Sequence, residues 1–83
     1  MVNRQQISAA RGWLGLSQQD LADLTGVSKR TISHFEGGDR LPHDRTLRDL
    51  QTALEQQGVE FLFENGRGVG IRAKPKTDSG DGA

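Results

Sequence analysis

The sequence predicts a mainly α-helical fold of four helices followed by a C-terminal β-hairpin or strand. Apolar residues recur at helical spacing through the first 58 residues, and glycines and hydroxyl residues stand where helices would end and start. After Gly58 the spacing changes to the alternation of a strand. With 83 residues, of which 33% are hydrophobic, the chain has room for one small domain with a thin core.

The first two helices have clear boundaries in the sequence. The first is expected over residues 3–14 and ends at Gly15, a residue that adopts a left-handed conformation at low cost. Ser17 and Asp20 have the spacing of a capping box and start the second helix, which Gly26 ends. The expected inward positions of these two helices are Ile7, Ala10, Leu14, Leu21, Ala22 and Thr25.

Two further helices are expected on either side of a loop. Ser28 caps the third helix, and the glycine- and proline-containing segment 37–42 forms the loop. The fourth helix starts at Asp44 or Arg45 and stops at Gly58. The expected inward positions here are Val27, Ile32, Phe35, Leu47, Leu50 and Leu54.

A hairpin is expected at the C-terminal end. Residues 59–64 alternate as a strand, and Asn65-Gly66 favours a two-residue type I′ turn, which returns residues 67–72 as a second strand. Regular pairing places Glu64 opposite Arg67, Phe63 opposite Gly68, Leu62 opposite Val69, Phe61 opposite Gly70 and Glu60 opposite Ile71. We expect the two glycines to leave space for the phenyl rings.

Trp13 lies one position off the inward stripe of the first helix and therefore needs cover from elsewhere. We expect the hairpin face that carries Phe61 and Phe63 to provide it, within the same chain or from a partner. A lone hairpin is marginal in water, so it has to pack on the helices or on another chain.

These elements divide the chain into three parts. Residues 1–58 form the helical domain, residues 59–73 form the hairpin as a candidate dimerisation element, and the polar residues 74–83 form a disordered tail. Without cysteine the chain has no disulfide, and it contains no apolar run of about 18 residues that would cross a membrane. We expect a cytoplasmic protein.

No catalytic or cofactor site is expected. Ser17 and Ser28 are explained as helix caps, since no histidine–carboxylate arrangement surrounds them. His34 and His43 have no third ligand at a metal-binding spacing. The sequence therefore predicts a protein that is not an enzyme and holds neither a metal nor another cofactor.

The second and third helices, joined by a tight turn at Gly26, have the form of a helix-turn-helix, in which the second of the two helices enters the major groove of DNA. Net charge is zero, but residues 25–35 contain two cations and no carboxylate. Because Ile32 and Phe35 hold the third helix from behind, its outward side chains are Lys29, Arg30, Ser33 and His34.

The stretch "LSQQDLADLTGVSKRTISHFEGGDRLP" resembles the helix-turn-helix core of the phage-repressor-like, or XRE, family of bacterial and phage proteins. The resemblance implies that Ser28, Lys29, Arg30, Ser33 and His34 contact bases, and that Gln18, Arg40 and Arg45 contact phosphates. It also implies a structural ion pair between Arg11 and Glu36. Where family members commonly read bases with Gln, this chain has Lys29 and Arg30, which favours guanine or phosphate contacts.

The function implied is a DNA-binding transcription regulator, a repressor by family habit. It would bind double-stranded DNA as a homodimer on a palindromic operator, with the two reading helices about 34 Å apart. One alternative is an antitoxin that binds a toxin protein and represses its own operon. Another is an adaptor that bridges a DNA-bound protein to polymerase.

Overall fold

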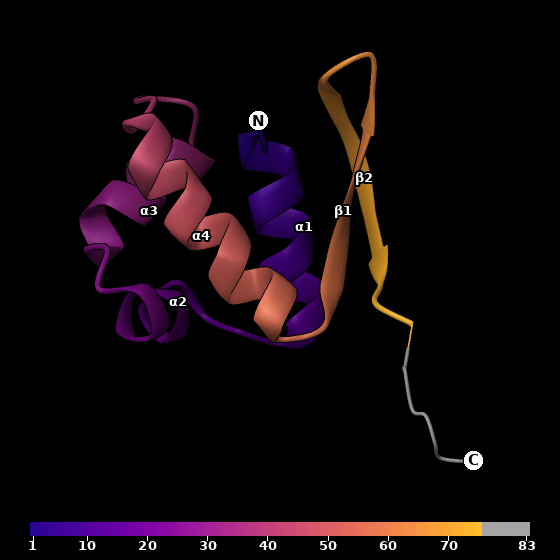
Figure 1. Ribbon diagram of the computed structural model, residues 1–83. Helices are drawn as coiled ribbons and strands as arrows, with labels where there is room; N and C mark the ends of the chain where they lie inside the picture. Colours follow the sequence, from indigo (N-terminus) through magenta and orange to yellow (C-terminus); the bar gives the residue numbers. More distant parts are fainter. Residues whose placement is uncertain (76–83) are drawn as a thin grey trace.

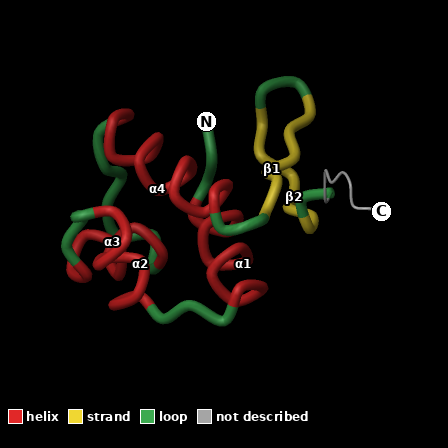
Figure 2. The backbone as a smooth tube through the Cα atoms, turned by 60° about the horizontal axis from the view of Figure 1, so that its bottom comes forward, coloured by secondary structure: helices red, strands yellow, loops and turns green. Residues whose placement is uncertain are grey.

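The structure is a computed structural model that describes residues 1–75, and these residues form four helices and one antiparallel hairpin. The elements are α1 (Arg4–Leu14), α2 (Gln18–Thr25), α3 (Lys29–Glu36), α4 (Asp44–Gln56), β1 (Val59–Glu64) and β2 (Arg67–Ala73). The predicted fold class is confirmed. The helices gather into one bundle, and the hairpin lies beside α1, on the side away from α3 (Figures 1 and 2).

Lys74, the first residue of the predicted tail, is tied to the start of the hairpin, since its backbone N–H donates to the carbonyl of Gly58 at 2.8 Å. Residues 76–83 of that tail lie outside the described residues. Within the described part of the chain, every helix is too short or too polar to span a lipid bilayer.

Ser17 and Ser28 cap α2 and α3 as the sequence predicts, whereas Asn3, expected inside the first helix, is its N-cap. Asn3, Ser17 and Ser28 each accept a hydrogen bond from the backbone of the first turn of the helix that follows. Gly15 and Gly26 end α1 and α2 in the left-handed conformation, with φ of 71° and 77°. The fourth helix starts at Asp44, after His43, whose side chain makes no capping hydrogen bond.

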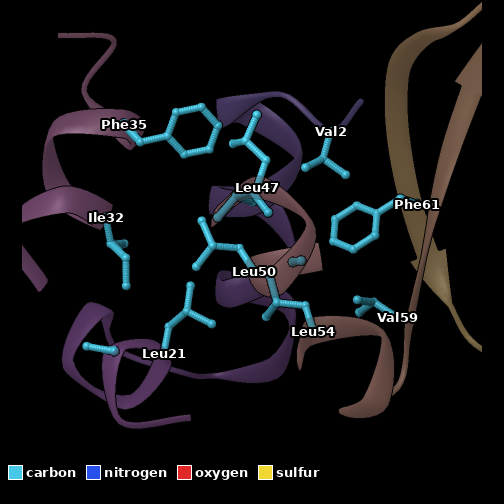
Figure 3. Packing of buried hydrophobic residues seen from close by; sticks show 12 residues of the cluster. Val2, Leu21, Ile32, Phe35, Leu47, Leu50, Leu54, Val59 and Phe61 are labelled. Atoms are coloured by element: carbon cyan, nitrogen blue, oxygen red, sulfur yellow. The ribbon is translucent and has the colours of Figure 1, made fainter. Parts of the chain in front are cut away.

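The core joins the four helices to the base of the hairpin. Its largest fully buried side chains are Ile7, Leu21, Ile32, Leu50, Leu54 and Val59. Figure 3 shows Phe35 and Leu47 on one side of this cluster, with Phe61 reaching toward it from the hairpin. Val59 and Phe61 are as well buried as the helical positions, so β1 completes the core of the helical bundle.

The hairpin turn is the predicted one, with positive φ at both Asn65 (54°) and Gly66 (78°). Next to the turn, Glu64 lies opposite Arg67 and Phe63 opposite Gly68, as expected. Farther along, the predicted register is wrong by one residue. A β-bulge leaves Val69 as the extra residue and places Leu62 opposite Gly70, Phe61 opposite Ile71 and Glu60 opposite Arg72.

The bulge has a packing reason. In the regular register Ile71 would share a face with Glu60, away from the core. The extra residue at Val69 reverses the faces of the residues that follow it. Ile71 then packs against the core beside Phe61, while Arg72 lies opposite Glu60 and forms an ion pair with it at 2.8 Å.

The expectation that the hairpin glycines make room for phenyl rings is wrong. A Cβ at Gly68 would overlap the side-chain amide of Gln6, whereas a Cβ at Gly70 would meet no atom of the described residues within 4 Å. Gln6 belongs to α1 and is only 2% exposed. The space at Gly68 therefore accommodates the helix, whereas no packing contact with residues 1–75 requires glycine at position 70.

Two amide side chains at the start of α1 hold the hairpin in place. Gln6 Nε2 donates to the carbonyls of Leu62 (2.9 Å) and Gly70 (3.0 Å), and Gln6 Oε1 accepts from the backbone N–H of Asn3 at 3.0 Å. Asn3 Nδ2 donates to the carbonyl of Gly68 at 3.0 Å. The buried amide of Gln6 is thus satisfied by hydrogen bonds that dock β2 on α1.

Candidate nucleic-acid interface

The turn between α2 and α3 is fixed by a compact set of hydrogen bonds. The backbone N–H of Gly26 donates to the carbonyl of Ala22 at 2.8 Å. The hydroxyl of Thr25 donates to the carbonyl of Leu21 at 2.8 Å and accepts from the backbone N–H of Val27 at 3.1 Å. Because glycine adopts the positive φ at this turn without strain, only three residues separate the end of α2 from the start of α3.

The first turn of α3 is capped by Ser28. Its Oγ accepts from the backbone N–H of Thr31 at 3.1 Å and also lies 2.9 Å from the Thr31 hydroxyl. Ser28 is exposed at the end of the helix that a helix-turn-helix directs toward base edges. The same hydroxyl therefore has a capping role in the free protein and a position suited to DNA.

The third helix has a buried side and an exposed side. Ile32 and Phe35 are buried against the other helices (Figure 3). The side chains of Lys29, Arg30 and Ser33 are exposed, and His34 is half-buried. Since α3 lies at the edge of the bundle away from the hairpin, this exposed side is not covered by the described chain (Figure 1).

The structure contains an ion pair between Arg11 of α1 and Glu36 at the end of α3. Arg11 donates through Nη2 to Glu36 Oε1 at 2.7 Å and through Nε to Oε2 at 3.0 Å. A further bond joins Arg11 Nη1 to the carbonyl of Leu16 at 3.0 Å. The Glu36 side chain is only 6% exposed, so this bidentate pair fastens α3 to α1 within the protein.

The environment of the pair favours both charged forms. Burial opposes ionisation of Glu36, but hydrogen bonds from Arg11 and Gln18, together with the Arg11 charge, outweigh it and lower the pKa of Glu36. The hydrogen bond to Glu36 raises the pKa of Arg11 against the smaller opposing effect of burial. The carboxylate therefore remains ionised below the pH at which an ordinary glutamate takes up a proton.

Gln18, expected at a phosphate, donates from Nε2 to Glu36 Oε1 at 3.1 Å in the free protein. A primary amide carries two hydrogens, so one donor remains for a second partner. The other expected phosphate contacts, Arg40 and Arg45, are exposed, in the loop after α3 and in the first turn of α4.

The sequence patterns do not identify Arg4 as a further cation beside these residues. Its Nη1 donates to the carbonyl of Glu36 at 3.3 Å, and Arg4 and Arg40 line the same groove of about 370 Å³. The partners are 32 positions apart, so no local spacing could reveal the contact.

The expected cover for Trp13 is not found among the residues that the structure describes. Trp13 is 65% exposed, and Phe61 turns into the core instead. Cover from a partner stays a prediction. The sequence does not predict a metal site. Among the described residues, no group of three or more His, Cys, Asp or Glu side chains could hold a metal ion.

Comparison with protein families gives one match. The model described as "Helix-turn-helix" matches residues 7–61, from the second turn of α1 into β1. A comparison with curated proteins gives no match. The family match covers more than half of the chain and includes the whole of α2, the turn and α3. The chain therefore belongs to the XRE-type helix-turn-helix family of DNA-binding transcriptional regulators.

Proposed function

We propose that the protein is a sequence-specific repressor that binds a palindromic operator as a homodimer. The observation that carries this proposal is the two-sided third helix. Ile32 and Phe35 fix its position from behind, while Lys29 and Arg30 stand exposed in its first turn. In helix-turn-helix proteins, side chains near this end of the helix contact base edges in the major groove.

Arg30 and Lys29 are the principal base-reading candidates. Both side chains favour guanine, whose O6 and N7 accept two hydrogen bonds, and a good bidentate contact discriminates by about 1–3 kcal/mol. Ser28, Ser33 and His34 lie on the same helix and complete the set of base contacts.

The phosphate contacts surround this helix. Gln18 stands at the start of α2, where free backbone N–H groups and the helix dipole favour an anion. Arg40 and Arg45 add exposed cations, and Arg4 joins them through the groove that it shares with Arg40. The local excess of cations supplies the electrostatic attraction that the neutral net charge of the chain does not.

Specificity requires two copies. One helix of eight residues reaches only a few base pairs, whereas a two-fold dimer reads two half-sites about 34 Å apart. The hairpin remains the candidate dimerisation element. Truncation after Gly58 does not test it, because removal of Val59 and Phe61 would open the core. Substitutions of single surface residues are needed instead to test whether the hairpin forms the dimer.

The test is selection of bound sequences from random duplex DNA, first with the natural protein and then with Arg30→Ala and Arg40→Ala. The natural protein should enrich a palindrome with half-sites one helical turn apart. Arg30→Ala should relax preference at one position in each half-site, while Arg40→Ala should weaken binding to all sequences alike. Equal effects of both variants on every sequence would contradict base reading by Arg30.

The antitoxin and polymerase-adaptor alternatives stay predictions, and no feature of residues 1–75 favours either over the homodimeric repressor. Co-purification of an unrelated small protein would favour the antitoxin, which would still enrich its own operator. Failure to enrich any sequence would favour the adaptor.

A further inference from the structure

One face of the molecule is largely apolar and is not covered by residues 1–75. Gln5, Ala9, Gly12 and Trp13 follow one stripe of α1 and are exposed. Beside them, Val69 at the bulge of β2 is 55% exposed, and a groove of about 410 Å³ between α1 and β2 is lined in part by Gln5, Ala9 and Val69. Both Trp13 and Val69 are large apolar side chains that usually find cover.

This α1/β2 face, formed by Gln5, Ala9, Gly12, Trp13 and Val69, carries no charge, although 27% of the chain is charged. In a two-fold contact a surface meets its own copy, so a surface that carries charges of one sign meets the same sign on the partner. Depletion of charged residues with an aromatic residue present is typical of the buried centre of a protein interface.

The outward faces of α2 and α3 are poor candidates for self-association. The outward face of α2 carries Asp20 and Asp23, and that of α3 carries Lys29 and Arg30. Pairing either face with its own copy would bring like charges together, and pairing α3 would also block the DNA-binding side. Among these faces, electrostatics therefore favours the α1/β2 face as the contact with a second copy.

Two glycines give an independent reason for close approach at this face. Gly12 lies inside α1 and Gly70 inside β2, where glycine weakens regular structure, and neither has a positive φ. A Cβ at either position would meet nothing within 4 Å among the described residues. The fold itself thus has no need for glycine there, whereas a second backbone packed closely on the face would.

We infer that the α1/β2 face binds the same face of a second copy of this chain. The inference rests on the homodimer of the proposed function and assigns it a surface. With the two α1 helices antiparallel and Ala9 at the two-fold axis, Trp13 of each copy lies near Gln5 of the partner subunit. Because the hairpin side lies away from α3, both DNA-reading helices stay uncovered (Figure 2).

The experiment measures dimer dissociation by analytical ultracentrifugation for the natural protein, Gly12→Glu and Leu24→Glu. Leu24 is 47% exposed on α2, outside the proposed interface, so Leu24→Glu places the same charge on another helix as a matched control. Gly12→Glu should raise the dissociation constant at least about tenfold, while Leu24→Glu leaves it unchanged. Trp13 is the only tryptophan, so its emission should shift to shorter wavelength as the natural protein associates.

A second variant, Gly12→Ala, separates loss of the interface from loss of folding, because alanine is a better helix former than glycine. It should raise the thermal midpoint in dilute protein and still weaken the dimer, since its Cβ meets the second copy. A natural dimer that Gly12→Glu and Gly12→Ala leave intact, or that Leu24→Glu weakens equally, would overturn this interface and leave the homodimer standing. A natural protein that stays monomeric free and on DNA would overturn the homodimer itself.

Discussion

The α2–α3 unit and the contact between α1 and β2 are held together in different ways. In the α2–α3 unit, the capping and turn hydrogen bonds join residues at most four positions apart, such as Ser28 with Thr31 and Gly26 with Ala22. In the α1–β2 contact, Gln6 and Asn3 bond carbonyls 64 and 65 positions away, and Gln6 also bonds the carbonyl of Leu62 in β1, 56 positions away. The first unit is therefore encoded locally, and the second depends on the whole chain being folded.

The largest effect is expected from Glu36→Gln, which removes the charge that fastens α3 to α1. Loss of one partner of a buried, bidentate pair leaves the Arg11 charge uncompensated and should lower the free energy of unfolding by about 3 kcal/mol, measured by urea denaturation at pH 7. The exposed Glu60–Arg72 pair is the control, and Glu60→Gln should change nothing measurable. Equal losses for the two variants would show that burial is not what makes the first pair matter.

The same pair predicts a pH dependence. The pKa of Glu36 is lowered below its ordinary value of 4.5, against burial, by the hydrogen bonds and charge of its partners. The unfolded chain therefore takes up the proton first as pH falls, and the stabilisation, complete above pH 4.5, is lost as pH falls through the lowered pKa. Unfolding measured from pH 7 to pH 3 should show a steeper acid decline for the natural protein than for Glu36→Gln.

Gly68→Ala tests the α1–β2 contact and should have the next largest effect. Its Cβ would displace the buried amide of Gln6 and break that amide's bonds to the hairpin, at a cost of about 1–3 kcal/mol. Gly70→Ala, two residues away with open space around it, is the matched control and should change the stability of dilute protein little. A comparison by thermal unfolding would contradict this account if both variants lost the same stability.

The smallest effect is expected in the local unit, from Ser28→Ala. Loss of the cap should cost about 1 kcal/mol, seen in urea denaturation. Ser28→Asp keeps a capping oxygen, so it should restore stability, but its carboxylate would repel phosphates and weaken DNA binding in a mobility-shift assay. Normal DNA binding by Ser28→Asp would mean that this end of α3 does not approach the duplex.

The difference between local and long-range contacts explains which features the sequence could predict. The caps Ser17 and Ser28, together with Gly15 and Gly26, gave helix boundaries that the structure confirms, because each signal acts within a few residues. The hairpin turn was predictable for the same reason. The bulge at Val69 was not, because it arises where Ile71 has to reach a core built by distant helices.

The candidate site divides in the same way. The exposed side of α3 follows from helical spacing once Ile32 and Phe35 are known to point inward. The position of Arg4 beside Arg40 and the hydrogen bond from Gln18 to Glu36 depend on how helices pack, which spacing alone does not specify. The exposure of Trp13 was predicted, but the hairpin of the same chain does not cover it.

The burial of Phe61 has a practical consequence for anyone who wishes to transplant the DNA-reading unit into another protein. The segment that matches the family model, residues 7–61, stops in the middle of β1. It lacks both Gln6 and β2, the strand that pairs with β1. A graft cut at those limits would carry an unpaired strand edge and an exposed phenyl ring, both of which invite aggregation. A portable unit has to include Val2, which is buried in the core, and to extend through Lys74.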